Sequence, residues 1–190
     1  MNGTLRRGAL FVVAMTGLVA GTARAQSPEA PPAGLRLTAG GGLGYGTGGV
    51  HAGSGDSKPG GTLLGRIGVA RDGRPFLALD GEWQLYQAPV PDTKAKFDGF
   101  SALAGVTLFP TGDFYLTPQA GAQFRNWTGE GSEDYSSTGF AAGLNVGYLL
   151  SFGPGVSVSP ELYLRYAAIT GPAAPSFRSV GFRVMAAWVF

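Results

Sequence analysis

The 190-residue sequence contains no cysteine and a single histidine, His51. Without cysteine the chain has no disulfide framework, thiol nucleophile or thiolate metal site. A single histidine argues against a zinc site built from imidazole ligands. Charged residues are also few, at 14% of the chain. After residue 25, no apolar run approaches the roughly 20 residues that a membrane-spanning helix needs. We therefore expect no metal, no cofactor and no transmembrane helix in the processed protein.

The N-terminus has the three parts of a secretory signal peptide. Arg6 and Arg7 are followed by an apolar stretch over residues 9–20, and Ala23-Arg24-Ala25 matches an A-x-A cleavage site. We predict that residues 1–25 are a cleaved signal peptide and that the Pro-rich residues 26–33 are a short linker. Residues 34–190 are then long enough for one domain.

Removal of the signal peptide also removes the apparent basicity of the chain. It takes away three of the fourteen basic residues and leaves eleven Lys and Arg against twelve Asp and Glu. This balance gives no support for a nucleic-acid partner, and none is expected.

The rest of the chain alternates between apolar and polar residues with the period of a β-strand. The clearest example covers about residues 76–87, with Leu77 and Leu79 on one face and Asp80 and Glu82 on the other. Eight such strands can be counted. They lie at about 35–45, 61–70, 76–87, 100–108, 114–125, 140–150, 158–166 and 179–190.

The connections between these strands alternate strictly between long and short. The predicted long loops are residues 46–60, 88–97, 126–138 and 168–177, and the short turns lie at 72–73, 110–113 and 152–155. Nothing in a soluble sandwich requires all its long loops to lie at one end, whereas small membrane barrels have long loops at one end and short turns at the other.

Aromatic residues cluster at both ends of the predicted strands, and the outward positions between them are mainly aliphatic. Such girdles match the two interfaces of a bilayer. Near the short turns they are Phe76, Phe109, Phe114, Tyr115, Phe152 and Trp188, and near the long loops Tyr45, Tyr86, Phe97, Phe100, Phe124, Trp127, Phe140, Tyr166 and Phe177.

The last strand carries one continuous apolar face and ends on an aromatic residue. That face comprises Val180, Phe182, Val184, Ala186, Trp188 and Phe190. The strand resembles the closing strand of bacterial outer-membrane barrels, which the barrel-insertion machinery reads, although Met185 stands where such signals often have Gly. We expect it to pair with residues 35–45.

Together these patterns resemble the small eight-stranded outer-membrane proteins of the OmpA-barrel, OmpX and opacity-protein type. The resemblance implies an all-β, eight-stranded antiparallel up-and-down transmembrane β-barrel in a Gram-negative outer membrane. It also implies a monomer that contacts outer-membrane lipid or lipopolysaccharide, and the barrel-insertion machinery during biogenesis. A soluble lipocalin-like barrel, with its apolar face inside, is the alternative fold.

Seven polar residues share the inward face of the predicted strands, and we expect them to form a salt-bridged plug across the lumen. They are Arg66, Asp80, Glu82, Gln119, Asn145, Glu161 and Arg183. An eight-stranded barrel is just wide enough for side chains, and buried charges must be paired.

If the loops are symmetric about their centres, the strand register follows. Arg66 faces Asp80, with Glu82 one step diagonal. Gln119 then faces Asn145, Asn145 faces Glu161, and Glu161 faces Arg183.

Two other motifs give weak signals. Residues 44–49 match a G-x-G-x-x-G fingerprint by letter, but no helix can follow to hold a pyrophosphate. His51 has Ser54 and Asp56 nearby, as in outer-membrane hydrolases, but the stretch is Gly-rich and holds geometry poorly. We therefore expect no catalytic residues.

The predicted function is non-enzymatic: an envelope-structural or surface-interaction role through the extracellular loops. The first alternative is a narrow channel or transporter for small solutes, gated by the polar plug. A lipid-modifying outer-membrane enzyme is the third.

Overall fold

The computed structural model describes residues 34–51, 57–87, 96–128, 135–153, 155–169 and 176–190. The predicted signal peptide and linker, residues 1–33, lie outside this range. Within these ranges, no helix is long and apolar enough to span a bilayer.

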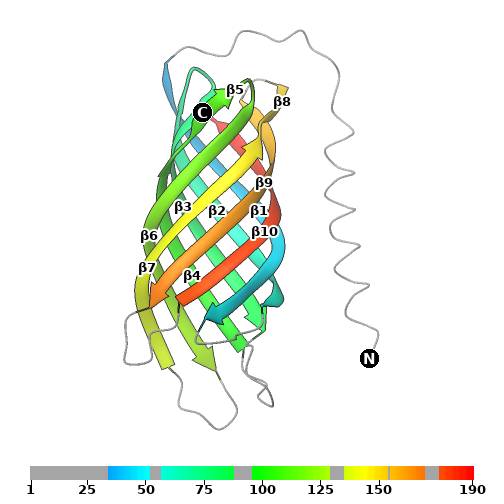
Figure 1. The fold of residues 1–190 in the computed structure, drawn as a ribbon. Helices are drawn as coiled ribbons and strands as arrows, with labels where there is room; N and C mark the ends of the chain where they lie inside the picture. Colours follow the sequence, from blue (N-terminus) through cyan, green and yellow to red (C-terminus); the bar gives the residue numbers. More distant parts are fainter. Residues whose placement is uncertain (1–33, 52–56, 88–95, 129–134, 154, 170–175) are drawn as a thin grey trace. The chain divides into compact units, whose positions relative to one another are not determined.

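The described residues form one closed antiparallel β-barrel (Figure 1). Two of its ten strands are short continuations: β5 follows β4 after Thr107, and β8 follows β7 after Leu149. Eight strands therefore cross the barrel, which confirms the predicted fold class. The bounds are β1 Leu35–His51, β2 Lys58–Arg71, β3 Arg74–Gln87, β4 Lys96–Val106, β5 Leu108–Thr111, β6 Phe114–Thr128, β7 Tyr135–Tyr148, β8 Leu150–Gly153, β9 Val156–Ile169 and β10 Ser176–Val189.

The first and last strands close the barrel. β10 pairs with both β9 and β1, and its register with β1 runs from Thr38 opposite Val189 to His51 opposite Ser176. The amide of Phe190 also donates to the carbonyl of Leu37 at 2.9 Å. The predicted closing pair is confirmed. No sheet edge is left along this seam, as a spanning sheet requires.

The turn between β2 and β3 has the geometry that its sequence predicts. Asp72 and Gly73 both have positive φ, at 51° and 78°, as in the tight turns that favour Asp-Gly. The Asp72 side chain also accepts a hydrogen bond from the amide of Gly34 at 2.9 Å. This end of the barrel also carries β5, β8 and the C-terminus (Figure 1).

The strands are longer at the other end than the sequence predicts. The predicted loops at residues 46–60, 126–138 and 168–177 include too many residues, because β1 extends to His51, β6 to Thr128 and β9 to Ile169. The Gly-rich end of β1 has no alternation of its own. It is extended because β10 and β2 supply hydrogen-bond partners on both sides.

The two faces of the barrel are those the alternation predicts. Outward apolar side chains such as Leu63, Ile67 and Leu79 are about half exposed, at 56%, 59% and 50%. Inward positions are mostly polar and buried. This arrangement is inside-out relative to a lipocalin-like barrel and rules that alternative out.

Two predicted girdle aromatics face inward instead. Tyr115 is 3% exposed and Phe177 is 1% exposed. The prediction placed them by their distance from a turn, but direction is set by strand parity. Tyr115 shares its face with Thr117, and Phe177 shares its face with Ser179, both buried.

Candidate functional site in the barrel lumen

Seven inward polar residues from six strands meet at one level of the lumen. Asp80, Glu82, Asn145, Glu161 and Arg183 are fully buried. Gln119 is 5% exposed, and the side chain of Arg66 is 12% exposed. These residues, with Arg165, are called the lumen network below.

Two ion pairs of the network join neighbouring strands. Arg66 on β2 donates to both carboxylate oxygens of Asp80 on β3, at 2.7 and 2.9 Å. Arg183 on β10 donates through Nε to Oε2 of Glu161 on β9. Both pairs are direct cross-strand partners in the register, as the sequence predicts. The bidentate Arg66–Asp80 geometry is among the strongest available to charged side chains.

An amide chain of Gln119 and Asn145 leads from Asp80 to Arg165, but in a different register from the predicted one. Gln119 lies opposite Gly143, and Asn145 lies opposite Tyr163. The predicted opposition of Asn145 to Gln119 and to Glu161 is therefore wrong by two residues, because the loops are not symmetric about their centres. Asn145 nevertheless reaches Gln119 diagonally, with Nδ2 donating to Oε1 at 3.0 Å.

The amide chain ends on charged groups at both sides. Gln119 donates to Oδ2 of Asp80 at 2.7 Å. Arg165 donates from Nη1 to Oδ1 of Asn145 at 2.8 Å. Each amide thus donates at one end and accepts at the other, so β3, β6, β7 and β9 are linked through side chains.

Three further contacts cross the lumen between strands that are not neighbours. Arg66 on β2 donates to Oε1 of Glu161 on β9 at 2.8 Å. Arg165 on β9 and Arg183 on β10 both donate to Oε2 of Glu82 on β3, at 2.8 and 3.0 Å. At this level side-chain hydrogen bonds therefore bridge opposite walls of the lumen.

The network is balanced in charge, with three guanidinium groups facing three carboxylates. Asp80 contacts Arg66 and Arg183, and Glu161 contacts the same two arginines. Glu82 contacts Arg165 and Arg183. Removing charges from water is tolerated only with such pairing and hydrogen bonding.

The sequence prediction missed one member of the network, Arg165, and two residues that hydrogen-bond to the network, Tyr115 and Gln84. Arg165 supplies one of its three cations. Tyr115 donates to Oε1 of Glu161 at 2.6 Å, and Gln84 donates to Oε1 of Glu82 at 2.7 Å. Strand parity could have found all three, because each shares an inward face with a residue already assigned to the lumen.

Inward glycines make room for these large side chains. A Cβ on Gly147 would lie 2.5 Å from Cζ of Tyr115 and 3.0 Å from Cγ of Glu161. A Cβ on Gly143 would lie 2.5 Å from Nη1 of Arg165. The many glycines thus let long polar side chains lie flat against the neighbouring strands.

The other motifs do not form a site within the described residues. Residues 44–49 lie in the extended strand β1, so this stretch is no dinucleotide fingerprint. His51 ends β1; its side chain, Ser54 and Asp56 lie outside the described part. Among the described side chains, no group of three or more His, Asp or Glu could hold a metal ion.

Comparison with known proteins supports the architecture alone. No protein-family model matches the chain, and no curated protein matches it. Among solved structures, Neisserial surface protein A aligns with a TM-score of 0.59 at 15% identity, covering 83% of this chain and 99% of that one.

Two further structures show the same likeness. Ail, the attachment invasion locus protein of Yersinia pestis, has a TM-score of 0.51 at 16% identity and covers 80% of this chain and 97% of its own. The N-terminal β-barrel domain of Pseudomonas aeruginosa OprF has a TM-score of 0.52 at 14% identity and covers 79% and 97%. This chain therefore has the fold of the small eight-stranded outer-membrane β-barrels.

Proposed function

We propose that this chain is a non-enzymatic integral outer-membrane protein that acts through its surface in envelope structure or surface interaction. The observation that carries this proposal is the lumen network, which closes the barrel interior with buried ion pairs between opposite walls. The apolar exterior of the strands suits a bilayer. The protein is then left to interact with other molecules at its rims and outer wall.

A closed lumen weighs against the channel alternative. Opening a path through this level would separate Arg183 from both Glu82 and Glu161. Charges that lose their partners while buried are costly, and several such pairs would have to part together. This favours a fixed plug over a gate.

The strand ends opposite the short turns are the natural place for a surface role. At this end β1, β3, β6 and β9 finish, and β2, β4, β7 and β10 begin. In small outer-membrane barrels the long loops lie outside the cell. Two proteins with this fold are named as a surface protein and an attachment invasion locus protein, in keeping with such a role.

Conductance across a planar lipid bilayer tests the proposal. The purified protein should insert and show no stable openings. Asp113→Ala, which removes the exposed partner of Arg74, should behave in the same way. Stable openings in the wild type would instead assign a channel.

The enzyme alternative has its own test. The purified barrel should leave lipid A and phospholipids unchanged on prolonged incubation, as followed by mass spectrometry of the extracted lipids. Turnover that is lost in His51→Ala would overturn the non-enzymatic assignment.

A further inference from the structure

One charged side chain stands apart on the outer wall of the barrel. Arg178 lies on β10 in phase with Val180 and Phe182, which both face outward. Among the side chains that the structure describes, it is the one charged residue on the exterior of the strands away from the short turns. It lies near the loop end, opposite Tyr166 on β9 and Gly49 on β1.

Arg178 makes no ion pair with any described residue. Its guanidinium carbon lies 5.8 Å from the ring centroid of Tyr166, a cation–π distance. The neighbouring outward positions described on β9 and β10 carry no carboxylate. The contact with Tyr166 places the cation on the wall and leaves its N–H donors available to an anion.

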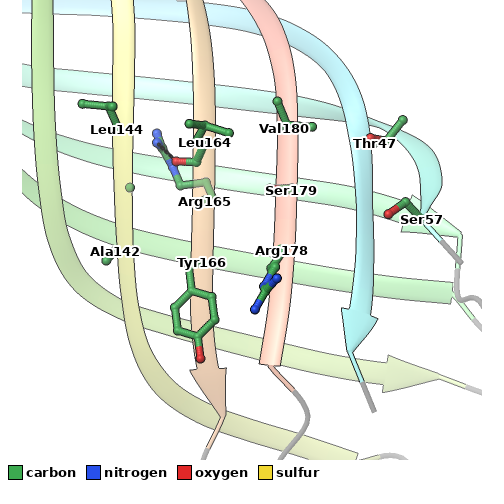
Figure 2. A pocket seen from close by; sticks show the side chains of 11 residues that line it. Thr47, Ser57, Ala142, Leu144, Leu164, Arg165, Tyr166, Arg178, Ser179 and Val180 are labelled. Carbon is green, nitrogen blue, oxygen red and sulfur yellow. Dashed lines mark hydrogen bonds between the residues drawn. The ribbon is translucent and has the colours of Figure 1, made fainter. Parts of the chain in front are cut away.

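Arg178 borders a surface pocket with a volume of about 610 Å³. Figure 2 shows Arg178 and Tyr166 side by side toward the strand ends, with Leu164 and Val180 one step further from the loops. Leu144 on β7 and Thr47 on β1 extend the lining to either side. The pocket is thus cationic toward the loops and apolar toward the middle of the barrel.

This polarity matches a lipid in the same leaflet. A lipid places its headgroup at the interface, where aromatic residues gather, and its acyl chains toward the bilayer centre. Arg recognises phosphate well because its planar fork of donors can bind two phosphate oxygens at once. Leu144, Leu164 and Val180 lie where the upper part of an acyl chain would pass.

We propose that the outer wall formed by β7, β9, β10 and β1 binds a phosphorylated membrane lipid, with Arg178 on the headgroup phosphate and Leu164 and Val180 against its acyl chain. This site rests on the proposed placement of the protein in an outer membrane. It assigns a specific lipid contact to a barrel whose lumen is closed. Tyr166 is a positioning residue that holds the guanidinium at the wall.

Native mass spectrometry of the barrel in nanodiscs tests this site. The discs contain phosphatidylcholine with a small fraction of lipid A, either bisphosphorylated or dephosphorylated. The wild type should retain bisphosphorylated lipid A about tenfold better than dephosphorylated lipid A, because one charge-assisted hydrogen bond has about this effect on affinity. Arg178→Gln should reduce retention to the level of the dephosphorylated form.

Arg71→Gln is the matched control, because Arg71 is exposed at the opposite end of the barrel, where β2 ends. It should retain the bisphosphorylated lipid as well as the wild type does. Equal retention by Arg178→Gln, or equal loss in both variants, would overturn the site. Heat-modifiable mobility in the neutral lipid alone reports insertion separately. A barrel that does not insert into the neutral lipid contradicts the membrane placement. A folded barrel that retains both forms of lipid A equally contradicts only the lipid site.

Discussion

At the scale of single residues, the lumen network depends on carboxylates that each contact two arginines. Asp80 is fully buried and accepts two hydrogen bonds from Arg66 and one from Gln119. Asp113 offers a contrast, because its pair with Arg74 is about half exposed. An aspartate carboxylate therefore contributes differently to the free energy of unfolding at the two positions.

Asp80→Ala should destabilise the barrel by about 3–5 kcal/mol, because it leaves Arg66 buried with one of its two carboxylates missing. Asp113→Ala should cost about 0–1 kcal/mol, the usual value for an exposed pair. Urea titration of both variants in phospholipid vesicles, followed by tryptophan fluorescence, measures the difference. Equal stability losses in the two variants would show that the network does not hold the barrel together.

At the scale of one element, the two faces of β10 meet different environments. One face is the apolar outer wall of the barrel, and the other points into the polar lumen. Val180, Phe182 and Val184 are 47%, 49% and 44% exposed on the outer face, whereas Arg183 is fully buried in the lumen. A shift of one residue in register would exchange these faces. The register is therefore set by the burial of Arg183 as well as by the apolar outer positions.

Val184→Arg should destabilise the barrel by about 2–4 kcal/mol, the cost of an arginine on the lipid face near the middle of the bilayer. Leu35→Arg is the matched control, because Leu35 begins β1 at the short-turn rim, where the same change costs about 0–1 kcal/mol. The free energy of unfolding in phospholipid vesicles gives both values. Equal costs for the two variants would place Val184 outside the lipid-facing band.

Much at this scale could be predicted from the sequence, since side-chain direction alternates locally. The outward face of β3 follows from parity, and the Arg66–Asp80 pair follows from parity and the short turn at residues 72–73. The Glu161–Arg183 pair follows from parity and from the assumption that the long connection between β9 and β10 is symmetric. The register of β6 with β7, which places Gln119 opposite Gly143, was predicted two residues out because the sequence does not specify where the connection between these strands has its centre. Tyr115 was misplaced for another reason: its distance from a turn was given more weight than its parity.

At the scale of the whole molecule, closure joins strands that are far apart in the sequence. Leu43 on β1 lies opposite Val184 on β10, and both side chains face outward. The chain contains no cysteine, so an introduced pair can report this contact without interference.

The double variant Leu43→Cys with Val184→Cys should form a disulfide on oxidation, because directly opposite residues have Cβ atoms about 4.5–5.5 Å apart. The linked chain is detected as a mobility change on a denaturing, non-reducing gel. Leu43→Cys with Val180→Cys is the control. Its positions are four residues out of register, so it should cross-link poorly. Efficient linkage of the control pair would contradict the register of the seam.

The sequence by itself determined the number of crossing strands, the two faces of each strand, the closing pair and the identity of most lumen residues. These properties follow from a local period of two residues and from the alternation of long and short connections. Only the tertiary structure decided which cation meets which anion across the lumen. Arg165 and Glu82 are 83 positions apart in the chain. They meet because closing the sheet brings opposite walls within reach of one side chain, a distance set by the strand number and stagger of the whole barrel.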